Sequence, residues 1–233
     1  MLLSKLKNLI IFFLRLYGLY ILFFICVGLL SSILPELDLK KYSQDSLLEI
    51  IKNNKLKAFF AMVVLAQVIE EFMFRTLLKP SKNDLTLFFS AWSLFLIGII
   101  IPVHLEWYYK YSISLLIFLL LFIVYYKTIP TPILKKITTY LTQHQIWVLQ
   151  ITAVIFGFLH IFNYVDSFMI DNVLFLMIVP RIIAGHLFGR IKIENKHIIW
   201  PILLHAMNNG VVFLITHLTH NDMLKRGLCS FKC

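Results

Sequence analysis

Residues 9–34 read LIIFFLRLYGLYILFFICVGLLSSIL, an apolar run that contains a single charged side chain, Arg15. A helix needs about 20 apolar residues to cross the hydrocarbon core of a membrane. The run exceeds that length, and it is too long for the apolar part of a cleaved signal peptide. We therefore expect these residues to form the first membrane span.

The same pattern recurs along the rest of the 233-residue chain, which is 60% hydrophobic and only 15% charged. An ordinary soluble domain is about a quarter charged, so the composition is typical of an integral membrane protein. We predict an all-α fold, a single membrane-embedded helix bundle over residues 1–233, in which residues 35–55 and 127–145 form the longest loops outside the membrane. About seven spans are expected, within a range of six to eight, at 9–34, 56–78, 85–103, 111–126, 146–164, 172–190 and 197–218.

The net charge of +10 does not indicate a nucleic-acid partner, because the lysines and arginines lie in short segments between the spans. Such segments are typical of topology signals and of contacts with lipid headgroups, so membrane lipids are the expected partners. Basic residues after the second, fourth and sixth spans favour a cytoplasmic N-terminus, although the lysines within 35–55 oppose that orientation.

Three polar clusters interrupt the predicted spans, and each is a candidate functional site because ionisable groups are costly inside a membrane. They are VIEEFMFR (68–75) on the second span, FGFLHIFN (156–163) on the fifth and HAMNN (205–209) on the seventh. All three fall within a few helical turns of the expected midplane, which permits one shared site.

Helical spacing sorts the first cluster into two parts, because side chains four residues apart share a helix face and adjacent ones diverge by about 100°. Glu71 and Arg75 are four apart, so we predict that they pair with each other. Glu70 then has no partner on its own helix and is expected to find one on another span.

The other two clusters each place a histidine beside a polar or aromatic neighbour. His205 and Asn209 are four residues apart and share a face, as do Phe156 and His160. The predicted site therefore consists of Glu70, His160, His205 and Asn209, with Glu71, Arg75, Phe156 and Asn163 in supporting positions.

These residue types suit hydrolysis of an amide bond without a covalent intermediate. A carboxylate and an imidazole in a water-poor cavity can activate a water molecule, while a second imidazole and an amide can donate hydrogen bonds to an oxyanion. Two other interpretations remain open. Glu70, His160 and His205 can instead be three ligands of a catalytic divalent metal such as zinc, or the polar groups can serve only to join helices.

The three motifs resemble, in the same order, those of the CPBP family of intramembrane proteases, the CAAX protease and bacteriocin-processing family also called Abi. EEFMFR (70–75) is similar to its E-E-x-x-x-R motif, FGFLH (156–160) to F-x-x-x-H, and HAMNN (205–209) to H-x-x-x-N. The resemblance covers residues 65–212. Two expected spans at 85–126 make the gap between the first two motifs longer than in the compact form of the family.

The resemblance implies an intramembrane endopeptidase in which Glu70 and His160 activate water and His205 with Asn209 stabilises the oxyanion; some descriptions of the family assign a metal instead. A membrane-associated protein or peptide is the implied substrate, and a bacterial plasma membrane the implied location. Eukaryotic relatives trim prenylated CAAX proteins, and bacterial relatives are linked to bacteriocin maturation or self-immunity. Two alternatives stay open: a non-catalytic immunity or scaffold protein, and a proton-coupled transporter, which the absence of an internal repeat disfavours.

Overall fold

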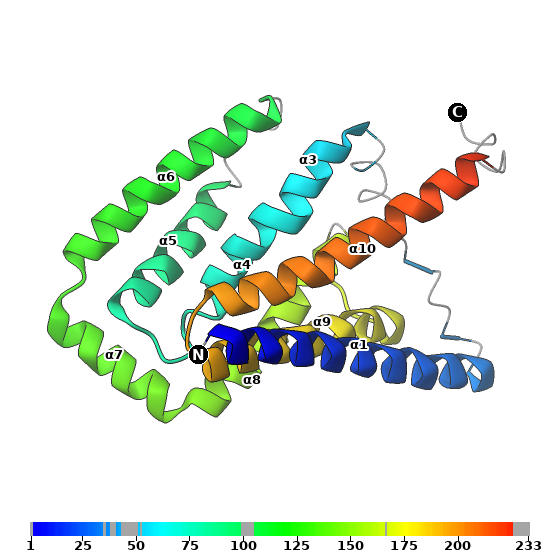
Figure 1. Ribbon diagram of the computed structural model, residues 1–233, viewed down its shortest axis with the longest axis horizontal. Helices are drawn as coiled ribbons and strands as arrows, with labels where there is room; N and C mark the ends of the chain where they lie inside the picture. Colours follow the sequence, from blue (N-terminus) through cyan, green and yellow to red (C-terminus); the bar gives the residue numbers. More distant parts are fainter. Residues whose placement is uncertain are drawn as a thin grey trace.

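The computed structural model describes residues 2–34, 36–37, 41–42, 51, 53–98, 105–165 and 167–225, with side chains to residue 218. Within these ranges every regular element is helical, and no strand is present, which confirms the predicted all-α fold (Figure 1). The elements are α1 (Leu2–Ile33), α3 (Lys55–Phe59), the π-helix η2 (Phe60–Leu65), α4 (Ala66–Phe74), α5 (Lys82–Gly98), α6 (Trp107–Thr128), α7 (Thr131–Gln143), α8 (Gln145–Leu159), the 3₁₀-helix η3 (His160–Asn163), α9 (Asn172–Asn195) and α10 (Ile199–Lys225).

Five helical segments of the described chain are long and apolar enough to cross a membrane: α1, α6, α8 with η3, α9 and α10. The other two predicted spans also form helices. Residues 56–78 correspond to the interrupted run from α3 to α4. Residues 85–98 of the predicted span 85–103 lie in α5, which has 17 residues, and residues 99–103 lie outside the described residues. The prediction of a helical protein that crosses the membrane several times is therefore confirmed. The predicted loop 35–55 lies largely outside the described residues.

Residues 127–145, expected to lie outside the membrane, form for the most part the helix α7 rather than an irregular loop, and α7 is not among the helices long and apolar enough to cross a membrane. A search for long apolar runs misses it, since its sequence TPILKKITTYLTQ mixes lysine and threonine with apolar residues at helical spacing. Pro132 lies in its first turn, where a proline costs no helical hydrogen bond. In Figure 1, α7 joins the ends of α6 and α8 at the edge of the bundle.

The first helix packs against α9 and α10, and its buried face includes Phe12 and Leu16. Its N-terminal end is also fixed by polar contacts with the end of α9. Asn8 Nδ2 donates to Asn195 Oδ1 at 3.1 Å, and Asn195 Nδ2 donates to the carbonyl oxygen of Lys5 at 3.2 Å. The predicted first span is thus an integral part of the bundle.

The start of α5 is fixed by a capping box and by an ion pair. Ser81 Oγ accepts from the Asp84 backbone N–H at 3.1 Å, and Asp84 Oδ2 accepts from the Ser81 backbone N–H at 3.0 Å. The other oxygen of Asp84, Oδ1, lies 3.0 Å from Lys192 Nζ on α9, and both side chains are mostly buried. These contacts attach the hairpin of α5 and α6 to the bundle.

Close packing of α8 against α9 depends on glycine. A Cβ atom at Gly157 would collide with Ile182, and one at Gly189 would collide with Leu149. Small residues at such crossings let helix backbones approach each other within a membrane. The close approach brings the C-terminal end of α8, with His160 just beyond it, into the centre of the bundle.

Candidate active site

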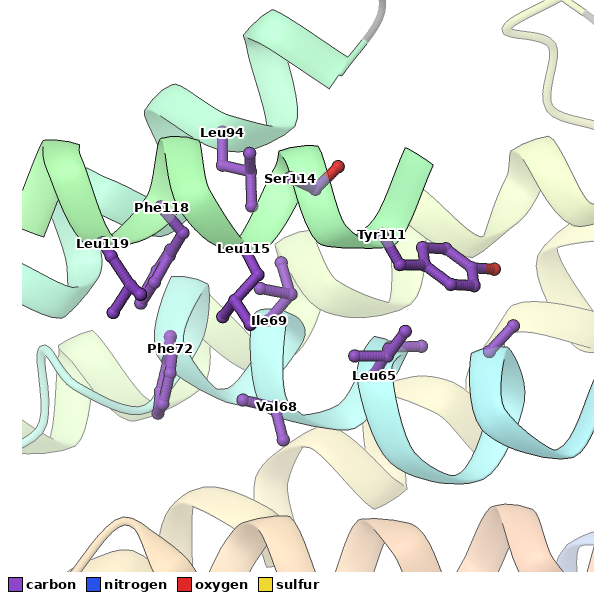
Figure 2. Close-up of a pocket in the computed structure, with 12 residues that line it drawn as sticks. Leu65, Val68, Ile69, Phe72, Leu94, Tyr111, Ser114, Leu115, Phe118 and Leu119 are labelled. Carbon is purple, nitrogen blue, oxygen red and sulfur yellow. The ribbon is translucent and has the colours of Figure 1, made fainter. Parts of the chain in front are cut away.

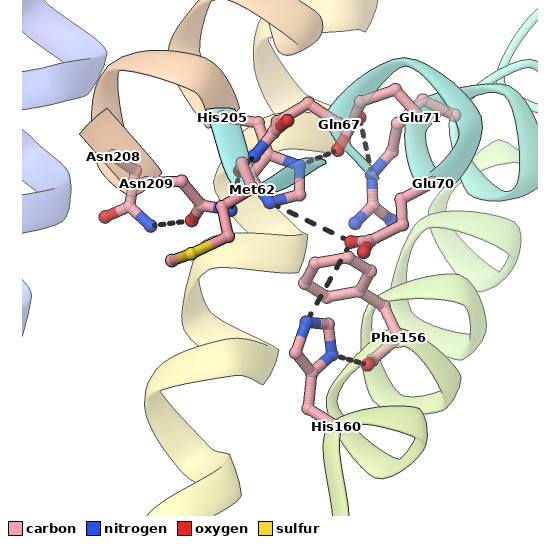
Figure 3. A network of polar contacts seen from close by, with 10 residues as sticks. Met62, Gln67, Glu70, Glu71, Phe156, His160, His205, Asn208 and Asn209 are labelled. Carbon is pink, nitrogen blue, oxygen red and sulfur yellow. Dashed lines mark hydrogen bonds and ion pairs between the residues drawn. The ribbon is translucent and has the colours of Figure 1, made fainter. Parts of the chain in front are cut away.

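Three helices place one carboxylate between two imidazoles (Figure 3). Glu70 lies on α4, His160 is the first residue of η3, and His205 lies on α10. Glu70 Oε2 is 3.9 Å from His160 Nε2 and 3.8 Å from His205 Nε2. The structure therefore brings these three predicted site residues together, whereas the catalytic roles expected for them remain predictions.

The position of His160 differs from the predicted α-helical span at 146–164. The α-helix ends at Leu159, and the chain continues through His160 as a short 3₁₀-helix. The Nδ1 atom of His160 lies 2.7 Å from the carbonyl oxygen of Phe156, one turn earlier. A carbonyl only accepts hydrogen bonds, so Nδ1 carries the proton and the Nε2 atom of the neutral ring is an acceptor facing Glu70.

The second imidazole is oriented in the same way by a carboxylate. His205 Nδ1 lies 2.9 Å from Glu71 Oε1, and both side chains are buried. This contact turns the Nε2 atom of His205 toward Glu70. A carboxylate that holds one ring nitrogen commonly fixes both the tautomer and the ring position of a functional histidine.

Glu71 has a second partner, which is the one that helical spacing predicted. Its Oε2 atom lies 3.3 Å from Arg75 Nε, and both side chains are 0% exposed. Arg75 Cζ also lies 4.9 Å from the centre of the Phe156 ring. Glu71 therefore does more than pair with Arg75, because the same carboxylate links the arginine to the histidine of the third motif.

Asn209 reaches the helical segment before the first motif through a backbone oxygen. The π-helix η2 shifts the hydrogen-bond pattern just before α4, and the carbonyl oxygen of Met62 accepts side-chain hydrogen bonds from Gln67 Nε2 and from Asn209 Nδ2, the latter at 3.2 Å. Short π segments often occur at functional sites. The amide nitrogen of Asn209 has two hydrogens, so one remains for another acceptor. The Nδ2 atom of Asn208 donates to Asn209 Oδ1 at 3.2 Å.

Aromatic rings enclose the polar groups. The Phe156 ring centre is 4.6 Å from that of His160 and 5.6 Å from that of His205. Phe188 stacks on His205 from the other side at 4.5 Å. Phe156, predicted as a supporting residue, therefore packs between both histidines and the Arg75 guanidinium, and it shields the ion pair from solvent.

A cavity of about 550 Å³ adjoins the carboxylate. Glu70, His160 and Asn163 supply its polar lining, and the remaining walls are mainly apolar side chains such as Met73 and Phe95. Asn163, the last of the predicted supporting residues, thus faces the same space as the Glu70–His160 pair. A few polar groups converging in an apolar cavity are the usual form of a small binding or reaction site.

The zinc interpretation finds no matching geometry in the described part of the chain, where no group of three or more His, Cys, Asp or Glu side chains is arranged to hold a metal ion. Tetrahedral zinc, with bonds of about 2.0–2.1 Å, places neighbouring ligand atoms roughly 3.3 Å apart. The two distances from Glu70 Oε2 to the imidazole nitrogens are about half an ångström longer than that. The assignment of Glu70, His160 and His205 as metal ligands therefore stays a prediction.

Sequence reasoning gave no role to two residues near the site. Gln67 is fully buried, and its Oε1 atom has no hydrogen-bond partner among the described residues. The sequence feature that could have indicated Gln67 was its amide side chain inside an apolar run, one turn before Glu70. Arg181 on α9 interacts electrostatically with both Glu70 and His160.

These features define a class of protein: a helical membrane protein with a carboxylate between two oriented imidazoles, beside an apolar cavity that the carboxylate and one imidazole line, an arrangement that suits a membrane-embedded hydrolase. The family model described as type II CAAX prenyl endopeptidase Rce1-like matches residues 52–211. This match covers more than half of the chain, which therefore belongs to the Rce1-like type II CAAX prenyl endopeptidase family, and the resemblance seen in the three motifs is confirmed. The chain is a membrane peptidase that acts on peptide bonds. Searches of curated proteins and of solved structures find no match.

Proposed function

We propose that this peptidase cleaves membrane-associated protein or peptide substrates with a water molecule activated by Glu70 and His160. The observation that carries the proposal is the position of Glu70 Oε2, which faces the Nε2 atoms of two histidines beside a cavity of about 550 Å³. The oxygen is buried and has no hydrogen-bond partner among the described residues, so it is free to accept one from water.

In the proposed reaction, one proton passes from the water molecule to Glu70 and then to the nitrogen of the cleaved bond. Glu70 takes the proton as the water oxygen attacks the carbonyl carbon of the scissile bond, and the Nε2 atom of His160 accepts a hydrogen bond from the other hydrogen. Glu70 then gives its proton to the nitrogen that leaves. The contact of His160 Nδ1 with the Phe156 carbonyl supports this role, because it keeps the lone pair of Nε2 on the cavity side.

The second part of the proposal assigns the oxyanion to His205 and Asn209. Asn209 has one amide hydrogen beyond the one given to Met62. Glu71 accepts from Nδ1 of His205, so donation from Nε2 requires the ring to carry both protons. Its positive charge would lie between the Glu70 and Glu71 carboxylates, and Arg75 would balance the second of these. Such preorganised donors contribute strongly to acyl-transfer reactions.

Substitution of Glu70 or His160 tests the proposed function. We expect Glu70→Ala and His160→Ala each to abolish cleavage of a susceptible membrane substrate by the purified protein in liposomes, because each removes a partner of the water. Circular dichroism and thermal unfolding in detergent should show that both variants keep the fold. Full activity in both folded variants would contradict the proposal and favour a non-catalytic immunity or scaffold role for the polar cluster.

Metal removal separates the water mechanism from the zinc alternative. We expect the purified protein to keep its activity after treatment with a strong chelator, because the proposed chemistry needs only the carboxylate and the imidazoles. Metal content measured on the same active sample should be well below one equivalent. Loss of activity on chelation, reversed by added Zn²⁺, would show that Glu70, His160 and His205 hold a metal.

A further inference from the structure

A second cavity, of about 500 Å³, lies between the first-motif helix and the hairpin of α5 and α6 (Figure 2). Leu65, Ile69 and Phe72 line it from η2 and α4, and Leu115 and Phe118 line it from α6. Almost all of the lining is apolar. The hydroxyl of Ser114, the small polar side chain in the wall, already donates to the carbonyl oxygen of Lys110 at 2.8 Å.

This second cavity adjoins the one beside Glu70, because Ala66 and Ile69 line both. Ala66 lies one helical turn before Glu70, and Ile69 directly precedes it. A substrate segment held beside Glu70 therefore lies next to the wall that the two cavities share. At its other end, the rings of Phe72 and Phe118 stack with their centres 5.9 Å apart. Both rings belong to the apolar wall of the cavity.

We propose that this second cavity is a specificity pocket, which receives a large apolar side chain of the substrate peptide close to the bond that is cleaved. The proposal rests on the proposed function, since it places the scissile bond beside Glu70. The proposal also assigns a function to α5 and α6, the two helices that lengthen the chain between the first two motifs. Their contribution to the pocket comes mainly from Leu115 and Phe118.

The expected selectivity follows from shape. Lipid chains are as apolar as the pocket walls, so a side chain gains little from leaving the membrane and binds through close packing. A side chain that fills more of the pocket should therefore bind better than a small one. Differences of about tenfold or more are typical when the fit of an apolar group changes.

Binding to an inactive variant tests the pocket without relying on cleavage. The probe is a fluorescent transmembrane peptide whose single central residue is Ala, Leu or Phe, and the protein is the full chain with Glu70→Gln in phosphatidylcholine nanodiscs. We expect the Leu or Phe peptide to bind at least about tenfold more tightly than the Ala peptide. Equal affinity for all three, or no binding of any, overturns the proposal.

A pair of substitutions on α6 shows whether the pocket causes the preference. Leu115 is 60% exposed and points from α6 toward α4 across the cavity in Figure 2, whereas Leu120 is 55% exposed and does not line it. Leu115→Trp should remove the advantage of the large side chain and leave the Ala peptide unaffected, and Leu120→Trp should change nothing. If a membrane lipid fills the pocket instead, Leu115→Trp will not alter the order of affinities, and the inference fails.

Failure of this inference can be told apart from failure of the proposed function. If Glu70→Ala abolishes cleavage while Leu115→Trp leaves selectivity among the three peptides intact, the protease assignment of Glu70 stands and the pocket assignment is wrong. Conversely, a preference that depends on Leu115 in a protein whose cleavage survives Glu70→Ala supports the pocket and contradicts the water mechanism.

Discussion

Replacing Arg75 with alanine should lower the free energy of unfolding by about 3–5 kcal/mol, which is the usual cost of leaving one member of a buried ion pair without its partner. Glu71 and Arg75 are both 0% exposed, and the guanidinium also packs on Phe156. Without it, the Glu71 carboxylate keeps one partner among the residues that the structure describes, His205. Reversible unfolding of the purified protein in detergent, followed by circular dichroism, measures the loss.

The chain contains a matched control for this prediction. Arg190 and Glu194 on α9 are also four residues apart and lie 3.2 Å from each other, but their side chains are 52% and 34% exposed. Arg190→Ala should therefore cost less than about 1 kcal/mol, because exposed ion pairs contribute little. An equal loss of stability in both variants would contradict the structural role assigned to Arg75.

A double substitution separates the structural role of the pair from its role at the site. Replacing a buried ion pair with apolar residues of similar size is often neutral for stability, so Arg75→Met combined with Glu71→Leu should recover most of the loss. Activity should not recover, because His205 Nδ1 then lacks the acceptor that turns its Nε2 atom toward Glu70.

The parts of the site that sequence predicted are those set by local geometry or by motif order. Helical spacing was enough to pair Glu71 with Arg75, because side chains four residues apart are neighbours on one face of a helix. Spacing also left Glu70 without a partner on its own helix, and the order of the motifs suggested His160 and His205 as its neighbours. These inferences needed no knowledge of how the helices cross.

The remaining contacts depend on helix rotation and on departures from regular helix, which spacing does not reveal. The hydrogen bond from His205 to Glu71 joins residues that are 134 positions apart, and it requires a particular rotation of α10 against α4. The Met62 carbonyl becomes an acceptor for Gln67 and Asn209 where η2 interrupts the α-helix. The spacing of apolar residues in the sequence does not reveal such a π segment.

The second cavity illustrates the same limit. From sequence, residues 85–126 were two additional apolar spans that put any assumed substrate groove in doubt. Their function could not be inferred from composition, because the same leucines and phenylalanines can face lipid or another helix. Only the placement of α6 beside α4 shows that Leu115 and Phe118 face a space next to Glu70.

Replacing Glu70 with glutamine should lower kcat by about 10²–10⁴-fold, and His160→Ala should do so by a similar factor, which is the usual range for a general acid or base. The two residues are proposed to act on the same water molecule. The double variant should therefore be about as slow as the slower single variant, because groups that act as a unit give strongly non-additive effects.

Single-turnover kinetics on the three variants, in liposomes that contain one defined peptide substrate, provide this comparison. His186→Ala is the matched control, since His186 lies on α9 and contacts Gln150 rather than Glu70. Its rate should equal that of the unsubstituted protein. If the fold reductions in rate of the two single variants instead multiply in the double variant, Glu70 and His160 act on separate steps. A shared water molecule then cannot be the nucleophile that both of them activate.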